Sequence, residues 1–199
     1  MPATVRAHDV HDTPGAAAPR QIPAGHGERV WFTNNLMVLK ATAESTGGAY
    51  GLVEALAPAG SGPPLHVHHR EDESFWILEG ELTVRCGEQL FAAGPGSYTF
   101  LPRGVAHTFA VEGDLPARIL SMCSPGGLEQ YFVAAGRPAE SAELPPAAPV
   151  DAALLARVGQ DFGVEIIGPP MAPVGTAGLR PNEGLAPGSS RIRPQSVRG

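Results

Sequence analysis

Residues 63–80, PPLHVHHREDESFWILEG, gather three histidines and four acidic residues in one short stretch that bears directly on the fold. The two prolines that open it, Pro63 and Pro64, disfavour a helix at this point. In an extended chain alternate side chains share a face, so His66 and His68 project side by side, about 6.6 Å apart along the strand. Two imidazoles placed in this way can bind one metal ion. A histidine-rich surface turn is the alternative interpretation.

The acidic end of the stretch predicts a turn followed by a second strand. Glu73 and His68 have opposite parity, so they can share a face only if a turn or bulge lies between them. The strand that follows then places Glu73, Phe75 and Ile77 on one face and Trp76 on the other. A carboxylate buried beside apolar side chains costs several kcal/mol unless it is paired. A divalent cation would supply that partner.

A later segment, GPGSYTFLPRGVAHTFAVEG (residues 94–113), contains a third histidine directly after a turn. Strand parity puts Phe109 and Val111 on the same face as His107. Three imidazoles and one carboxylate, with positions left for water or substrate, suit a catalytic transition metal. A closed structural zinc site would more often use cysteine. If there is no metal, His107 packs in an apolar core.

The rest of the central region consists of short apolar runs separated by turns. Residues 44–48, ESTGG, predict a hairpin turn between strands at 36–43 and 49–58. Such spacing without intervening helices predicts an all-β antiparallel sandwich or barrel. The further expected strands are 73–80, 81–87, 96–102, 105–113 and 117–124.

The pattern changes after residue 125. Helical spacing predicts one helix over 128–135 and a second that is capped by Asp151 and ended by Gly163. Residues 164–170 could lie along the barrel as an extended strip. The predicted organisation is an N-terminal arm (1–25), a barrel (26–125), a C-terminal helical segment packed on the barrel (126–169) and a disordered tail rich in Pro, Gly and Arg (170–199).

The two histidine-bearing segments resemble the paired signature motifs of the cupin superfamily. Gly60, His66, His68, Glu73 and Gly80 keep the spacing of the first motif, and Gly96, Pro102, Gly104 and His107 keep that of the second. Val111 stands where the second motif has Asn, which removes a polar group from the cavity wall. The resemblance implies a cupin double-stranded β-helix, or jelly-roll barrel, with His66, His68, Glu73 and His107 as metal ligands.

The single barrel followed by helices is most similar to the quercetin 2,3-dioxygenase-like cupins with one barrel. That resemblance implies a metal-dependent dioxygenase (an oxidoreductase) that cleaves or oxidises a small apolar enol or flavonol-type substrate with dioxygen. Glu73 would be both ligand and general base. The cofactor would be one divalent transition metal ion, either Fe, Ni, Mn, Co, Cu or Zn. A homodimer is also expected. The alternatives are a non-redox cupin (a polyketide cyclase, isomerase or lyase) and a small-molecule-binding cupin without turnover.

Several neighbouring side chains receive provisional roles. Glu71 shares the parity of Glu73 and could compete with it as ligand, although the residues from His69 to Asp72 more naturally form a solvated rim. Trp76 would pack against another sheet or a second subunit. The expected substrate pocket consists of Phe75, Ile77, Tyr98, Phe100, Phe109 and Val111.

Composition excludes several classes of function. A net charge of −6 gives no basic surface for nucleic acid. No apolar run approaches the roughly 20 residues that span a bilayer, and the first residues lack the apolar core of a signal peptide. Cys86 and Cys123 fit two free thiols in a reducing compartment better than a disulfide. These features predict a cytoplasmic protein without nucleic-acid or membrane partners.

Overall fold

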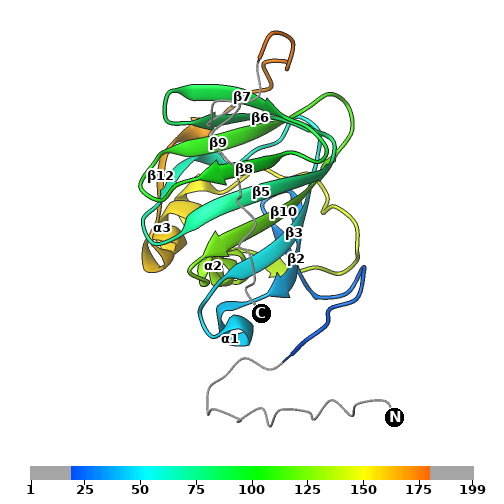
Figure 1. Cartoon of the computed structure of the whole chain (residues 1–199), viewed down its shortest axis with the longest axis vertical. Helices are drawn as coiled ribbons and strands as arrows, with labels where there is room; N and C mark the ends of the chain where they lie inside the picture. The colour runs from blue at the N-terminus through cyan, green and yellow to red at the C-terminus, as the bar shows by residue number, and fades with distance from the viewer. Residues whose placement is uncertain (1–18, 180–199) are drawn as a thin grey trace, which may run out of the picture.

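Two antiparallel β-sheets face each other in the computed structural model, which describes residues 19–179 (Figure 1). The larger sheet contains, in order across it, β11 (Arg137–Pro138), β1 (Glu28–Phe32), β2 (Asn35–Ala41), β3 (Gly51–Ala57), β10 (Ala117–Ser124), β5 (Asp72–Glu79) and β8 (Tyr98–Leu101). The smaller sheet contains β12 (Val164–Pro170), β4 (Pro64–His68), β9 (His107–Glu112), β6 (Glu81–Cys86) and β7 (Gln89–Ala93). The predicted all-β jelly-roll barrel is confirmed.

Alternating side chains explain how the two sheets enclose one core. Every second residue of β3 and of the first part of β10 is buried, so Val53 and Ala55 face inward beside Ile119. They join an apolar cluster that reaches both sheets through Ile77 and Val84. Burying this cluster is the main force that holds the sheets together.

Two details of the strand region differ from the prediction. Strands β2 and β3 pair as a hairpin, but their connection contains a short helix, α1 (Ala43–Thr46), which Thr42 caps. Strands β1, β7 and β11 were not among the predicted strands. Strand β7 is short, and its first two residues are exposed.

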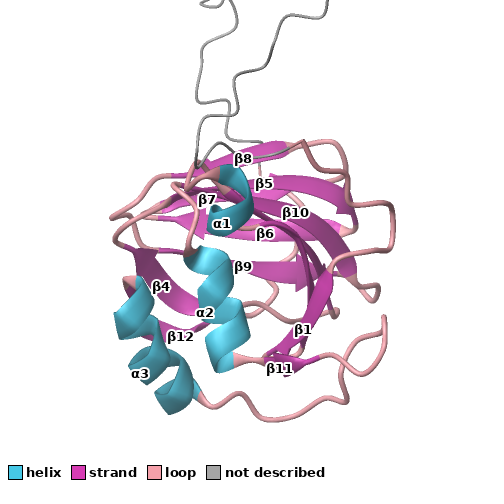
Figure 2. Ribbon diagram, turned by 90° about the horizontal axis from the view of Figure 1, so that it is seen from below, coloured by secondary structure: helices cyan, strands magenta, loops and turns pink. Residues whose placement is uncertain are grey.

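The C-terminal segment forms helices α2 (Leu128–Ala135) and α3 (Ala152–Phe162), which lie side by side across one end of the barrel (Figure 2). The predicted caps of α3 are both confirmed. Oδ1 of Asp151 accepts a hydrogen bond from the backbone N–H of Leu154 at 2.9 Å, and Gly163 ends the helix in the left-handed conformation. Strand β12 then pairs with β4, as the expected extended strip would.

Gly80 illustrates why one motif glycine is required. It is the single residue between β5 and β6, which belong to different sheets. Its φ of 79° is unfavourable for a residue with a side chain, and a Cβ there would lie 2.8 Å from Cα of Ala117. The sharp crossover between the sheets therefore needs glycine.

The predicted division of the chain at residues 25, 125 and 169 stays a prediction. Most of the arm (1–25) and most of the tail (170–199) lie outside the described residues. Within residues 19–179, no helix is long and apolar enough to span a bilayer. Cys86 is half-buried, Cys123 is buried, and both are free thiols.

A pair of cations lowers the pKa of Glu54 on β3. One oxygen of Glu54 lies 2.5 Å from Nη1 of Arg118, and the other lies 3.2 Å from Nζ of Lys40. Burial raises the pKa of Glu54, but hydrogen bonds from Arg118 and Lys40 outweigh burial and bring the pKa below its ordinary value of 4.5. Since the pKa is lower in the folded than in the unfolded chain, the stabilising contribution is present above pH 4.5 and is lost as the pH falls through the folded pKa.

We therefore expect Glu54→Gln to lower the urea midpoint of unfolding at pH 7 and to change it less at pH 3. The control is Glu88→Gln, because Glu88 is exposed in the turn before β7. Its urea midpoint should differ from that of the wild type by the same small amount at pH 7 and at pH 3. A difference between wild type and Glu54→Gln that grows on acidification would contradict the ion-pair assignment.

Candidate metal centre

The candidate metal centre draws its side chains from both sheets. His66 and His68 lie on β4, and His107 begins β9, which pairs with β4 at the His66–His107 position. Glu73 comes from β5 in the opposite sheet. All four side chains are buried. The fold therefore brings together all four residues that the motifs predicted.

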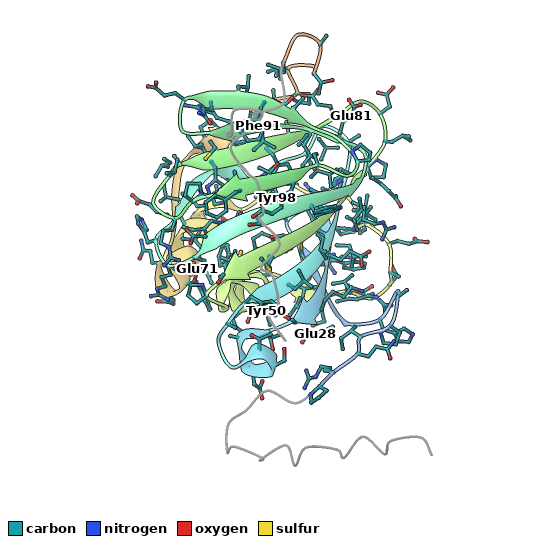
Figure 3. The ribbon with its side chains drawn as sticks, viewed as in Figure 1. Glu28, Tyr50, Glu71, Glu81, Phe91 and Tyr98 are labelled. Carbon is teal, nitrogen blue, oxygen red and sulfur yellow. The ribbon has the colours of Figure 1, made fainter. Side chains whose placement is uncertain are left out.

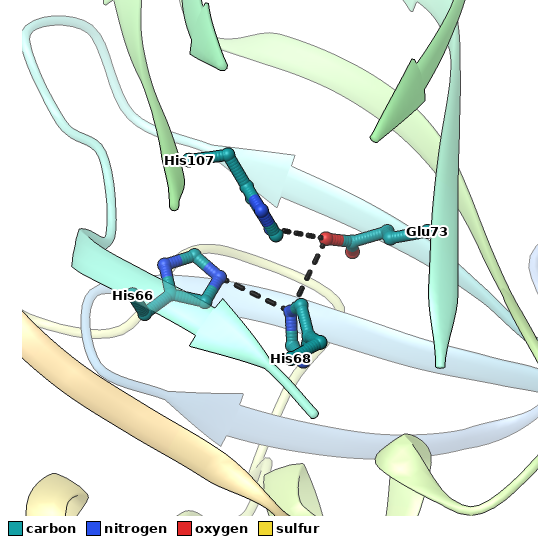
Figure 4. Close-up of side chains that lie close together, drawn as sticks. All are labelled: His66, His68, Glu73 and His107. Atoms are coloured by element: carbon teal, nitrogen blue, oxygen red, sulfur yellow. Dashed lines mark hydrogen bonds and ion pairs between the residues drawn. The ribbon is translucent and has the colours of Figure 1, made fainter. Parts of the chain in front are cut away.

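The polar atoms of the four side chains are close together (Figure 4). Nε2 of His66 lies 3.1 Å from Nε2 of His68, and Oε2 of Glu73 lies 3.4 Å from Nε2 of His68 and 3.3 Å from Nε2 of His107. All four atoms lie within 4.8 Å of one another. Atoms that each bind one ion at about 2.1 Å are separated from one another by about 3 to 4 Å. The cluster thus has the dimensions of a single-ion site.

Backbone carbonyls orient two of the imidazoles. Nδ1 of His66 lies 2.7 Å from O of Pro64, and Nδ1 of His107 lies 2.9 Å from O of Val105. Because a carbonyl only accepts, each Nδ1 carries the hydrogen and each Nε2 keeps its lone pair. Burial, together with the neighbouring His107 and His68, lowers the pKa of His66 to about 3. His66 is therefore neutral near pH 7, as metal binding requires.

Glu73 is held at both of its oxygens. Oε1 accepts a hydrogen bond from Oγ of Ser121 on β10 at 2.8 Å, while Oε2 faces His68 and His107. Burial raises the pKa of Glu73, but the close contacts of its carboxylate with the imidazoles of His107 and His68 outweigh burial and bring the pKa well below its usual value. Glu73 is therefore a carboxylate near neutral pH, with one oxygen fixed by Ser121 and the other directed at the cluster.

The donor set fits a divalent metal ion. Three imidazole nitrogens that face one another have no mutual attraction, and the buried carboxylate beside them is costly without a positive charge. A cation coordinated by all four groups satisfies the nitrogen lone pairs and the carboxylate together. Neither free cysteine belongs to the cluster, which agrees with a site of nitrogen and oxygen donors.

The cluster opens into an apolar cavity of about 90 Å³. Pockets for drug-sized ligands usually measure roughly 300–1,000 Å³, so this space is small. The rings of Phe75 and Phe109 lie edge to face, 5.6 Å apart, beside the cluster. The C-terminal segment covers the cavity with Leu128, Tyr131, Phe132, Leu155, Val164 and Ile166.

The six side chains that were predicted to line the pocket separate into three groups. Phe75 and Phe109 do line the cavity. Ile77 and Val111 are completely buried in the adjacent core and do not line it. All four side chains face the inside of the barrel, as strand alternation predicted. The cavity does not extend as far as Ile77 and Val111.

The prediction for Tyr98 and Phe100 is wrong. They are 58% and 53% exposed on the outer face of the larger sheet. The inward positions of β8 are instead occupied by Thr99 and Leu101, which are buried. Parity alone could show that Tyr98 and Phe100 share a face, but not which face the barrel encloses.

The expected solvated rim is correct except at Glu71. His69 is exposed and pairs with Glu165 at 2.8 Å, and Asp72 pairs with Arg103 at 2.7 Å. Glu71, by contrast, is only 4% exposed, because it shares the inward parity of Glu73. It lies outside the four-residue cluster, which leaves Glu73 as the carboxylate of that cluster.

Two polar residues at the site were not found from the sequence. Ser121 holds Glu73, and Asn35 lines the cavity with a buried Oδ1 that has no hydrogen-bond partner, while its Nδ2 donates to Thr33. Both lie on strands outside the two motifs. Only the order of strands in the sheet brings them to the cavity, so no local pattern could have identified them.

Comparisons with known proteins agree with this fold and site. Residues 52–123 match the cupin domain family. The chain is 28% identical to quercetin 2,3-dioxygenase of Bacillus subtilis (strain 168) over 136 residues, which are 68% of this chain and 40% of that enzyme. It is 27% identical to the tetracenomycin polyketide synthase protein TcmJ of Streptomyces glaucescens over 123 residues, or 61% of this chain and 81% of that protein.

A solved structure from Thermotoga maritima, described as a predicted oxalate decarboxylase, supports the fold alone. It has a TM-score of 0.50 and 19% identity, and the match covers 53% of this chain and 99% of that one. The chain spans only 40% of the length of the Bacillus enzyme. The two motifs, the two-sheet barrel, the four converging side chains and these matches together show that residues 52–123 form a cupin domain and that the chain is similar to quercetin 2,3-dioxygenases.

Proposed function

We propose that this protein is a metal-dependent dioxygenase that cleaves or oxidises a small apolar enol. The observation that carries the proposal is the buried cluster of His66, His68, Glu73 and His107, which opens into an apolar cavity. In this proposal the four residues are the ligands of one divalent transition metal ion. Iron, nickel, manganese, cobalt, copper and zinc all accept such a set of nitrogen and oxygen donors.

The protein residues would bind the substrate and handle its proton. When bound, the metal ion would supply a Lewis acid that polarises the enol oxygen atoms, so that dioxygen can react with the substrate. Glu73 is a carboxylate directed at the same position, so it would accept the proton that the enol hydroxyl loses. Ser121 would keep the second oxygen of Glu73 in place during that transfer.

The cavity favours a small substrate. Its walls beside the cluster are the aromatic rings of Phe75 and Phe109, and its volume is about 90 Å³. Such a space favours a one-ring enol over a flavonol with three rings, unless α2 and α3 move apart. The unpaired Oδ1 of Asn35 would accept a hydrogen bond from a hydroxyl group of the substrate.

A non-redox metal-dependent reaction is the second candidate. The chain covers 81% of TcmJ, whose name places it in a polyketide synthase system, and only 40% of the Bacillus dioxygenase. In this alternative the same site would act as a Lewis acid in a cyclisation, isomerisation or elimination, and Glu73 would again accept the proton.

We expect the purified protein to contain a transition metal and to take up oxygen in step with the loss of an enol substrate. The screen would combine metal analysis with an oxygen electrode and a panel of hydroxypyranones, flavonols and other enols. His66→Ala should lose metal and reduce oxygen uptake by about 100-fold or more, because a ligand is removed. The control is His69→Ala, which alters an exposed histidine next to the cluster and should behave as wild type.

The same assay distinguishes the alternatives. Substrate loss at an unchanged rate without oxygen would contradict the dioxygenase and support the non-redox reaction. Absence of product in the wild type, together with unchanged ligand affinity in His66→Ala, would indicate a binding protein without turnover.

Ser121→Ala should weaken metal binding by about tenfold, because Oε1 of Glu73 loses the hydrogen bond that orients the carboxylate. Competition with a coloured chelator would measure the dissociation constant. Ser124→Ala is the matched control: Ser124 lies on the same strand but is exposed, and it bonds to the backbone of Ala49. Equal metal affinities in the two variants would show that Ser121 does not support the site.

We also propose that the outer face of the larger sheet is a homodimer interface. Trp76 and Tyr98 occupy paired positions on β5 and β8, and Phe100 lies one step further along β8 (Figure 3 labels Tyr98). Trp76 is 49% exposed, and Met122 on β10 extends the same apolar face. Among residues 19–179, strand β8 is also an edge of the sheet. A second copy of the chain would cover both the apolar face and the edge.

Sedimentation velocity at micromolar concentration should show a dimer for the wild type and a monomer for Trp76→Glu, because the charge would be buried in the interface. Leu115→Glu is the control, since Leu115 is a 74% exposed apolar side chain in the turn between β9 and β10. A monomeric wild type would rule out this interface.

A further inference from the structure

One imidazole of the cluster lacks the support that the other two receive. His66 and His107 each direct Nδ1 at a backbone carbonyl, whereas Nδ1 of His68 is buried and has no hydrogen-bond partner. Histidines that bind a metal almost always donate their second ring N–H to a carboxylate, a carbonyl or water, and this bond fixes both the tautomer and the orientation of the ring. The support of His68 is therefore incomplete.

A second unsatisfied group lies three residues further along the chain. Glu71 is 4% exposed, and its Oε2 has no hydrogen-bond partner. Within residues 19–179, the buried side-chain atoms without a partner are Oδ1 of Asn35, Nδ1 of His68 and Oε2 of Glu71. Two of the three thus belong to residues that are three positions apart in the chain, one a potential donor and the other an acceptor.

Glu71 lies in the short connection between β4, which ends at His68, and β5, which carries Glu73, and it lies under the start of α2. Oε1 of Glu71 lies 3.8 Å from the point where a Cβ on Gly127 would stand. Figure 3 shows the labelled Glu71 at the side of the barrel where α2 and α3 lie. Glu71 is therefore enclosed between β4, β5 and the helical cover.

Metal binding would make the missing bond necessary. A metal ion at Nε2 of His68 leaves Nδ1 as the only nitrogen of a neutral ring that can carry hydrogen. A buried N–H without an acceptor costs about 1–3 kcal/mol. The ring would then rotate towards any available acceptor, and its Nε2 would move away from the ion.

We infer that Glu71 is the positioning residue for His68, and that its carboxylate accepts the Nδ1–H of that imidazole in the metal-bound protein. This inference rests on the proposed metal site. The two groups are not hydrogen-bonded to each other in the structure, so the bond forms by rotation of the Glu71 side chain or through one water molecule. Glu71 touches neither substrate nor metal and acts through His68 alone.

The first experiment compares metal affinity in Glu71→Ala, Glu71→Gln and the wild type, with cobalt(II) as the probe and a chelator as competitor. Glu71→Ala should raise the dissociation constant about 10- to 100-fold. Glu71→Gln keeps an acceptor oxygen and should raise it less. Glu165→Ala is the control, because it removes an exposed carboxylate that pairs with His69 and should leave the dissociation constant unchanged.

The second experiment detects the proposed bond itself. In the zinc-loaded protein with 15N-labelled histidine, the ring N–H signals of His66, His68 and His107 should all be protected from exchange with solvent. In Glu71→Ala only the His68 signal should shift and exchange faster, and Glu71→Gln should restore part of the protection. A change confined to packing would not single out one ring N–H.

The outcomes separate this inference from the proposed function. A wild type that binds no cobalt or zinc would overturn both. Normal metal binding with an unaltered His68 N–H signal and a dissociation constant within twofold of wild type in Glu71→Ala would overturn the role of Glu71 alone. If Glu71→Ala does not fold, as judged by circular dichroism, the same criteria apply to Glu71→Leu, which also removes the acceptor oxygens but fills the buried space.

Discussion

The side chains of His66, His68, Glu73 and His107 are buried close together inside the barrel. The free-energy cost of removing these polar groups from water must be offset for the barrel to be stable. Glu73 is 6% exposed and comes from one sheet, while the three imidazoles come from the other. Removing a carboxylate from water is costly, and a cation held by all four groups offsets that cost. Since the four side chains come from both sheets, the site is complete only when the two sheets pack together.

The groups around the cluster come from widely separated parts of the chain. Carbonyls next to β4 and β9 orient His66 and His107, and Ser121 on β10 orients Glu73. Each of these contacts holds one polar atom of the side chain, which is Nδ1 in the two histidines and Oε1 in Glu73. The other polar atom of each side chain is left free to bind an ion. The cluster is therefore arranged for metal binding by its surroundings as well as by its own residues, as coordination of a metal by neutral imidazole requires.

The four-residue cluster and the cover of the cavity come from different parts of the chain. All four cluster residues lie within the cupin match at residues 52–123, whereas much of the cavity wall lies outside it. Strand β12 pairs with β4, which carries His66 and His68, and α2 and α3 cover the cavity. The segment that covers the cavity is therefore separate from the segment that carries the cluster.

Local spacing in the sequence alone determined the strands of the two motifs and the caps of α3, because each depends on residues close together in the chain. The four clustered residues were identified from the two motifs and their resemblance to cupins, since His107 lies 34 residues beyond Glu73. The tertiary structure decided which face of a strand is enclosed. Tyr98 and Phe100 turn outward and Glu71 turns inward, although their parities with neighbouring residues were known. It also decided which distant strands meet, so that Ser121 reaches Glu73 across a strand pair that no local pattern specifies. Burial and strand order are properties of the closed barrel, and they exist only when the two sheets pack together.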